Sequence, residues 1–102
     1  MYRARDAIEN ERWLAAIEQG GAELDVGTET VSTAQDLFLS SAPTADRSKK
    51  AIAAASLYAA TLITSDQRSQ VSVAEAMGVA RLSVQSNWKA VVETAGLDAP
   101  SW

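Results

Sequence analysis

The sequence predicts an all-α fold of five helices. Two prolines and five glycines are the only strong breaks in its 102 residues, and the apolar residues between them recur at helical spacing. That spacing favours helices over any strand content. A chain of this length buries about two-thirds of its unfolded surface around one core. We therefore expect residues 1–102 to form a single domain.

The first predicted helix covers about Arg5 to Gln19. Ile8, Leu14 and Ile17 recur there at helical spacing, while charged residues occupy the other side. The Gly20-Gly21 pair that follows is expected to end the helix, because glycine readily takes the left-handed backbone of a C-terminal cap.

The second predicted helix lies between Gly27 and Pro43. Thr28 or Thr30 is expected to cap its N-terminus, because a threonine hydroxyl can accept a hydrogen bond from an unpaired first-turn amide. Its core face consists of apolar residues at helical spacing, namely Val31, Ala34, Leu37 and Phe38.

The third predicted helix, KKAIAAASLYAATLIT, begins after Ser48 as its N-cap and is apolar on nearly every side. A surface helix cannot be apolar all round, and small alanines allow neighbouring helices to approach closely. We therefore expect this helix at the centre of the domain, with Tyr58 buried in it.

Residues 69–95 have the outline of a helix-turn-helix. A short helix, Gln70 to Met77, follows Ser69, and Gly78 suits a left-handed cap. A longer helix from Arg81 to about Thr94 has an apolar stripe that we expect in the core, formed by Val84, Trp88, Val91, Val92 and Ala95. Its other face carries short or amide-bearing side chains that can approach another surface: Arg81, Gln85, Ser86, Lys89 and Glu93.

The composition excludes several classes of chemistry. The chain has no cysteine and no histidine, so it lacks the parts of Cys/His zinc sites, thiol nucleophiles and imidazole acid-base catalysts. The carboxylates Glu9, Glu11 and Asp98 belong to no catalytic motif. We therefore expect that the protein is not an enzyme and that it binds no metal and no cofactor. No window approaches the roughly 18 apolar residues of a membrane span, and we expect a cytoplasmic protein.

The net charge of −4 and pI of about 4.6 argue against a generic nucleic-acid-binding domain. The charge is unevenly distributed, however. Residues 1–44 carry three Arg and eight Asp or Glu (−5), and residues 45–102 carry six Lys or Arg and five Asp or Glu (+1). Such a chain can present one mildly basic face to phosphates, although ordinary scatter of solvated charges explains the same numbers.

Three consecutive segments resemble the second cyclin-like repeat of archaeal transcription factor B and its eukaryotic counterpart, transcription factor IIB. These are LDVGTETVSTAQDLF, RSKKAIAAASLYAATLIT and SQVSVAEAMGVARLSVQSNWKAVV, between Leu24 and Val92. The resemblance implies a five-helix cyclin-like fold with a C-terminal helix-turn-helix. Together with the resemblance, the acidic, cysteine-free composition fits the cytoplasm of a halophilic archaeon. The first predicted helix matches only in position.

The resemblance also implies a DNA site. In the family the last helix enters the major groove beside the TATA box, and the positions of Leu82 and Gln85, with Ser86 beside them, are expected to contact bases. The family has arginine where this chain has Gln85; arginine suits guanine, whereas glutamine suits adenine. Phosphate contacts are expected from Arg47, Lys49, Lys50, Arg81, Ser83 and Lys89.

Two departures from the family weaken this expectation. Asn87 stands where a second arginine is common, and Ala80 stands where Ser or Thr usually caps the helix. Ser83 is expected to cap in its place.

The resemblance implies a DNA-binding transcription regulator or accessory factor without the family's zinc ribbon and first repeat. Its expected partners are double-stranded promoter DNA and either a second copy of the chain or another cyclin-repeat transcription factor, while a contact with the TATA-binding protein is left open. The alternative is a cyclin-fold protein-interaction module that binds the transcription machinery without reading DNA. A DNA reader should gather Arg47, Lys49, Lys50, Arg81 and Lys89 on one face.

Overall fold

The computed structural model describes residues 4–41 and 48–96, and the side chains among them from residue 10 onward. These residues form five helices and no strand: α1 (Ala4–Leu24), α2 (Thr28–Ser41), α3 (Lys49–Ile63), α4 (Gln70–Met77) and α5 (Arg81–Thr94). The predicted all-α fold of five helices is confirmed. The predicted end of the second helix at Pro43 lies outside the described residues.

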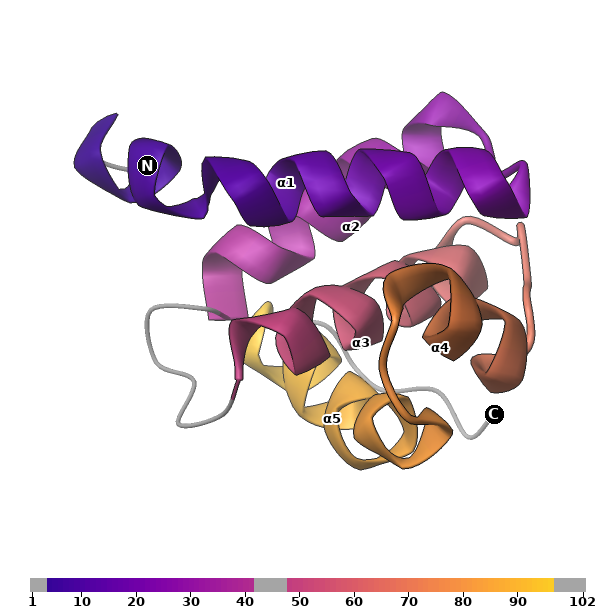
Figure 1. Ribbon diagram of the computed structural model, residues 1–102. Helices are drawn as coiled ribbons and strands as arrows, with labels where there is room; N and C mark the ends of the chain where they lie inside the picture. Colours follow the sequence, from indigo (N-terminus) through magenta and orange to yellow (C-terminus); the bar gives the residue numbers. More distant parts are fainter. Residues whose placement is uncertain (1–3, 42–47, 97–102) are drawn as a thin grey trace.

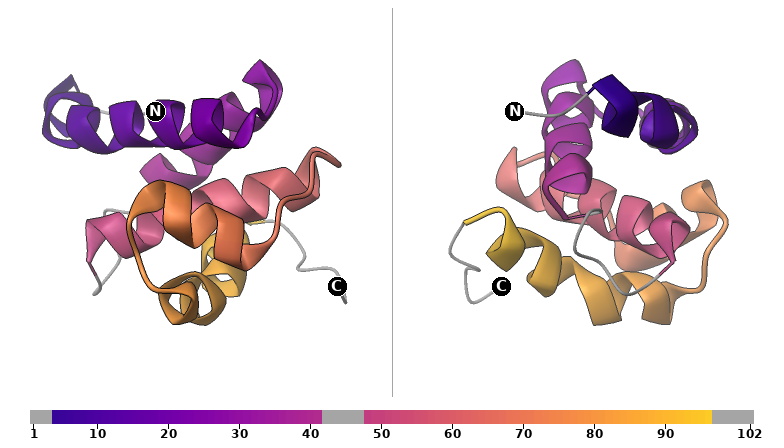
Figure 2. Two further views of the ribbon diagram at one scale, coloured as in Figure 1. Left: turned by 45° about the vertical axis from the view of Figure 1, so that its right-hand side comes forward. Right: turned by 90° about the vertical axis from the view of Figure 1, so that its left-hand side faces the viewer.

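Helix α3 is the centre of the domain. Figure 1 shows α1 and α2 above it, α5 below it and α4 beside it, and α3 contacts all four of these helices. Helix α4 also packs against α1. Every residue from Ile52 to Thr61 is buried. The turned views of Figure 2 show the same layering. The central position predicted from the apolar, alanine-rich sequence is therefore confirmed.

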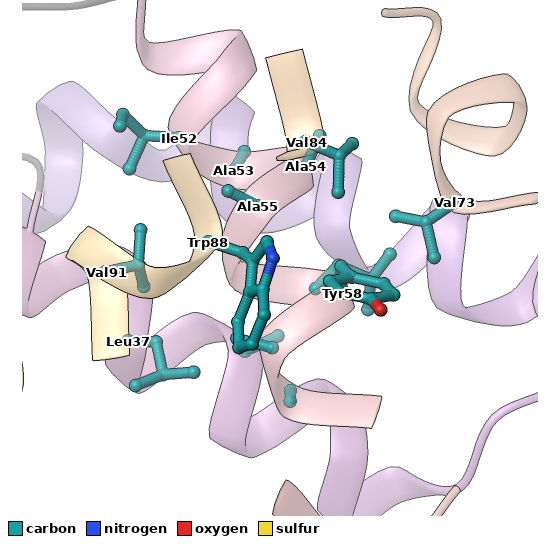
Figure 3. Close-up of a cluster of buried hydrophobic side chains, with 14 of the residues drawn as sticks. Leu37, Ile52, Ala53, Ala54, Ala55, Tyr58, Val73, Val84, Trp88 and Val91 are labelled. Atoms are coloured by element: carbon teal, nitrogen blue, oxygen red, sulfur yellow. The ribbon is translucent and has the colours of Figure 1, made fainter. Parts of the chain in front are cut away.

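The core between α3 and α5 is built around two aromatic rings (Figure 3). Tyr58 of α3 and Trp88 of α5 meet edge to face, with ring centroids 5.6 Å apart and an interplanar angle of 78°. Trp88 is only 4% exposed, and Met77 of α4 is buried as well. The predicted core positions of Tyr58 and Trp88 are confirmed, and the inner face of α5 packs firmly against α3.

The prediction that Gly20-Gly21 ends the first helix is wrong. Helix α1 continues through both glycines to Leu24, and Asp25 takes the left-handed backbone instead, with φ 57°. A Cβ atom at Gly20 would lie 2.5 Å from the sulfur of Met77, and one at Gly21 would lie 2.6 Å from a methyl carbon of Val31. The glycines therefore serve close packing between helices and do not cap α1.

The prediction that a threonine caps α2 is also wrong. Thr28 is already the first residue of α2, and the buried hydroxyl of Thr30 lies 2.7 Å from the hydroxyl of Thr64 and donates to Asp66. The carboxylate of Asp66 accepts a hydrogen bond of 2.8 Å from the backbone N–H of Gly27. A carboxylate from the distant α3–α4 loop thus lies at the N-terminus of α2, where negative charge is favourable.

Arg68 completes this contact between two loops. Its guanidinium donates to the carbonyl oxygens of Leu24 and Asp25, at 2.9 and 3.0 Å, and pairs with Asp66 at 3.1 Å. We call the side chains of Thr30, Asp66 and Arg68, with their backbone partners, the polar latch. The hydrogen bond from Gly27 lowers the pKa of Asp66; desolvation opposes this shift, and Thr30 and Arg68 reinforce it. The latch holds the loop that leads into α4.

Candidate nucleic-acid interface

Helix α4, a tight turn and α5 follow one another as the sequence predicted for residues 69–95. The hydroxyl of Ser69 accepts a hydrogen bond from the Ser72 N–H and caps α4. Gly78 ends α4 in the left-handed conformation with φ 70°, and the Val79 N–H donates back to the Ala74 carbonyl. These local bonds match the predicted boundaries and fix the turn before α5.

Helix α5 has one buried face and one exposed face. The buried face consists of Val84, Asn87, Trp88, Val91 and Val92. Leu82, Gln85, Ser86 and Lys89 are exposed, and their spacing of 0, 3, 4 and 7 places them on a single stripe. Leu82 is 64% exposed. The three residues predicted to contact bases therefore share an open face of α5.

Gln70, in the first turn of α4, connects two residues of that face. Its side-chain Nε2 donates a hydrogen bond to Oε1 of Gln85, and its Oε1 accepts one of 3.1 Å from Nη1 of Arg81. No sequence pattern indicated Gln70 as a functional residue. Residues 70 and 85 lie on different helices, and no helical period relates them.

The cations predicted to bind phosphate do not gather in one cluster among the residues that the structure describes. Lys49 turns toward α1, where its ammonium donates a 3.1 Å hydrogen bond to the buried Asn10. The side chain of Lys50 instead lies beside Gly78: a Cβ atom added to Gly78 would be 3.4 Å from Nζ of Lys50. Lys50 is thus beside the turn that leads to Arg81, whereas Arg47 lies outside the described residues.

Lys89 lies further along α5, where its ammonium is 5.6 Å from the ring centroid of Trp88. Both residues border an open cavity of about 580 Å³ between the end of α3, the α3–α4 loop and α5. The walls of this cavity are largely amide and hydroxyl groups, contributed by Ser65, Gln67, Gln70 and Gln85 together with Tyr58. The exposed face of α5 therefore continues into a polar hollow.

The start of α5 has no side-chain cap. Ala80 occupies the N-cap position and makes no side-chain hydrogen bond, as its methyl group requires. The prediction that Ser83 caps instead is wrong, since Ser83 lies inside α5, half-buried, and its backbone carbonyl accepts from the Asn87 amide at 2.6 Å. Asn87 is only 5% exposed, so it does not offer its amide to a phosphate.

Three further observations concern the residues that the structure describes. They contain no group of three or more carboxylate residues that could hold a metal ion. None of their helices is long and apolar enough to cross a membrane. Glu11 is exposed on α1, while the side chains of Glu9 and Asp98 are outside the described part of the chain.

Comparison with known proteins gives one consistent result. The model of the transcription factor TFIIB repeat family matches residues 14–94, which extends into α1 beyond the segments that carried the resemblance. The transcription initiation factor IIB of Archaeoglobus fulgidus is 29% identical over 87 residues. That alignment covers 85% of this chain and 26% of the relative, so the chain spans about a quarter of the relative's length. The match over most of α1 to α5, together with the five-helix architecture, shows that this chain belongs to the transcription factor TFIIB repeat family.

Proposed function

We propose that this chain is a DNA-binding transcription regulator or accessory factor that inserts α5 into the major groove of promoter DNA. The observation that carries the proposal is the exposed stripe of Leu82, Gln85 and Ser86 on a helix whose opposite face is locked into the core. A major groove about 12 Å wide admits one such helix. Gln85 and Ser86 supply hydrogen-bonding groups for base edges, and Leu82 supplies an apolar contact for a thymine methyl group.

Phosphate contacts are proposed at both ends of this stripe. Lys50 and Arg81 flank the turn before α5, and Lys89 lies two helical turns beyond Arg81. Because no side chain caps α5, the backbone N–H groups of Arg81 and Leu82 can donate to a phosphate oxygen, with the Ser83 hydroxyl nearby; the Ser83 N–H already donates to the Ala80 carbonyl. Arg47 and Lys49, which the family resemblance also assigned to phosphate, remain part of the proposal. The hydrogen bond from Lys49 to Asn10 makes Lys49 the weakest of the proposed phosphate contacts.

The proposed partners rest on the family of the chain, since its relative from Archaeoglobus fulgidus is a transcription initiation factor. One repeat offers few phosphate contacts, so we propose that the chain acts as a homodimer or beside another cyclin-repeat transcription factor. A symmetric pair would require half-sites about 34 to 36 Å apart. Light scattering with and without DNA tests self-association, and a constant single-chain mass under both conditions would indicate a different partner.

The test of DNA reading compares two exposed glutamines. Gln85 lies on the proposed face, whereas Gln19 lies on α1, across α3 from α5 (Figure 1). We expect Gln85→Ala to weaken binding to a selected DNA site by about 1 to 3 kcal/mol. Gln19→Ala should bind like the unchanged protein. Equal affinities of the two variants in a fluorescence anisotropy titration would contradict the proposal.

A second candidate function is a protein-interaction module of the same fold. It is favoured by two apolar side chains at the surface, Leu82 at 64% and Val71 at 50% exposure, since exposed apolar groups can anchor a protein partner. The acidic net charge of −4 favours it too. No DNA binding by the unchanged protein at low salt would support this candidate over the first.

A further inference from the structure

Three side chains form a directed chain of hydrogen bonds across the α4–α5 surface. Arg81 donates to Gln70, and Gln70 donates to Gln85. The residues are 11 and 15 positions apart in the sequence, so only the packing of α4 against α5 brings them together. We call this the amide relay.

Arg81 determines the direction of the amide relay. A guanidinium group has donors and no acceptor, so the atom of Gln70 that faces it must be the carbonyl Oε1. The NH₂ group of Gln70 then faces Gln85, and Gln85 must accept through its own Oε1. The orientation of both amides, which is often ambiguous for glutamine, is therefore set here by the chemistry of arginine.

This orientation changes what Gln85 offers to DNA. Its Oε1 accepts from Gln70 of α4, so Nε2, with two N–H donors, is the end of the amide that can meet a base edge. Guanine presents two acceptors in the major groove, N7 and O6, whereas the paired contact with adenine requires one donor and one acceptor from the protein. An amide with only its donors outward fits guanine better.

We propose that Gln70 is a specificity-determining residue that acts through Gln85 and shifts its preference from adenine to guanine. The inference rests on the proposed function, because it assigns a base to the same DNA-reading face. It also departs from the adenine preference expected for glutamine from the sequence alone. Gln70 is a positioning residue here; Gln85 makes the base contact.

The decisive variant is Gln70→Glu. A carboxylate still accepts from Arg81, but it has no donor for Gln85. Gln85 must then turn its NH₂ group toward residue 70 and present Oε1 outward. Bases with an exocyclic amine, adenine and cytosine, should now be preferred at the same step. The matched control is Gln67→Glu, an exposed glutamine on the wall of the same cavity that gains the same charge outside the relay.

Selection from a random DNA library with the unchanged protein and both variants measures the preference. We expect guanine at one step for the unchanged protein and Gln67→Glu, and adenine or cytosine at that step for Gln70→Glu, with the affinity ratio of the two sites changing by about tenfold. The same base for all three proteins would overturn the inference while leaving the proposed function intact. No binding by the unchanged protein would overturn the proposed function, and the inference with it.

A measurement without DNA tests the relay itself. In nuclear magnetic resonance spectra, the side-chain amide resonances of Gln85 should shift in Gln70→Glu and stay in place in Gln67→Glu. Circular dichroism confirms that each variant is folded, which surface substitutions should allow. Unchanged Gln85 resonances in folded Gln70→Glu would overturn the inference whatever the DNA result.

Discussion

Gly21 of α1 lies directly against Val31 of α2, with room for a hydrogen but not for a methyl group: a Cβ atom there would be 2.6 Å from Cγ2 of Val31. Val31 is β-branched and stiff at χ1, so it cannot easily move aside. We expect Gly21→Ala to lower the free energy of unfolding by about 1 to 2 kcal/mol. Overpacking costs about 1 to 3 kcal/mol, and alanine regains somewhat less than 1 through helix propensity.

A double-mutant cycle in urea separates the clash from other effects. In a Val31→Ala background the obstructing methyl groups are gone, so the same Gly21→Ala substitution should be neutral or stabilising. An equal cost in both backgrounds would mean that the close approach to Val31 is not the cause.

Trp88 and Leu82 give a contrast between the two faces of α5. Trp88→Ala removes a ring that is 4% exposed and packs against Tyr58, and it should lower the free energy of unfolding by about 3 to 5 kcal/mol. Leu82→Ala changes a side chain that is 64% exposed and should stay within about 0.5 kcal/mol of the unchanged protein. Denaturation midpoints measured by circular dichroism provide the comparison, and similar losses for both would place Leu82 in the core.

Asp66 predicts a pH dependence of stability. The pKa of its carboxyl is lowered in the folded state, chiefly by the hydrogen bond from Gly27, so the ionised form favours folding. This contribution is fully present above the ordinary pKa of 3.8 and is lost as the pH falls through the lowered folded value. We expect Asp66→Ala to be less stable than the unchanged protein at pH 7, with the difference shrinking in acid. A difference that stays constant from neutral pH down to about pH 2 would rule out this linkage.

Lys50 and Lys49 are neighbours with different expected roles. Lys50 lies beside the turn before α5, so Lys50→Ala should remove a phosphate contact and reduce the slope of log affinity against log salt by about 0.9. Lys49 is bonded to Asn10, so Lys49→Ala should reduce the slope by less than Lys50→Ala does and should also lower the free energy of unfolding. Anisotropy titrations over a salt series measure both slopes, and equal slopes for the two variants would contradict the different roles expected for Lys50 and Lys49.

The boundaries of α3, α4 and α5 could be predicted because their signals are local. Ser48 and Ser69 cap the helices that follow them, through bonds that reach only three residues ahead. Gly78 ends α4 through its own backbone conformation. The apolar stripe of α5 has a helical period and determines which face is buried, so the exposed positions of Leu82 and Gln85 also followed from the sequence.

Tertiary structure alone decided the role of the glycines in α1. The sequence shows that Gly20-Gly21 follows an amphipathic segment, which is a common end of a helix. The side chains of Met77 and Val31 that require the glycines belong to α4 and α2. No local pattern could have indicated them.

The polar latch and the amide relay also depend on contacts between residues that are distant in the sequence. Asp66 bonds to Gly27 across 39 positions, and Gln70 bonds to Gln85 across 15. Local propensity and periodicity act within a few residues, so they determined the five helices, their caps and the open face of α5. The partners of Asp66 and Gln70 were decided only when the helices packed around α3, because polar groups pair with whatever the packing brings within hydrogen-bonding distance.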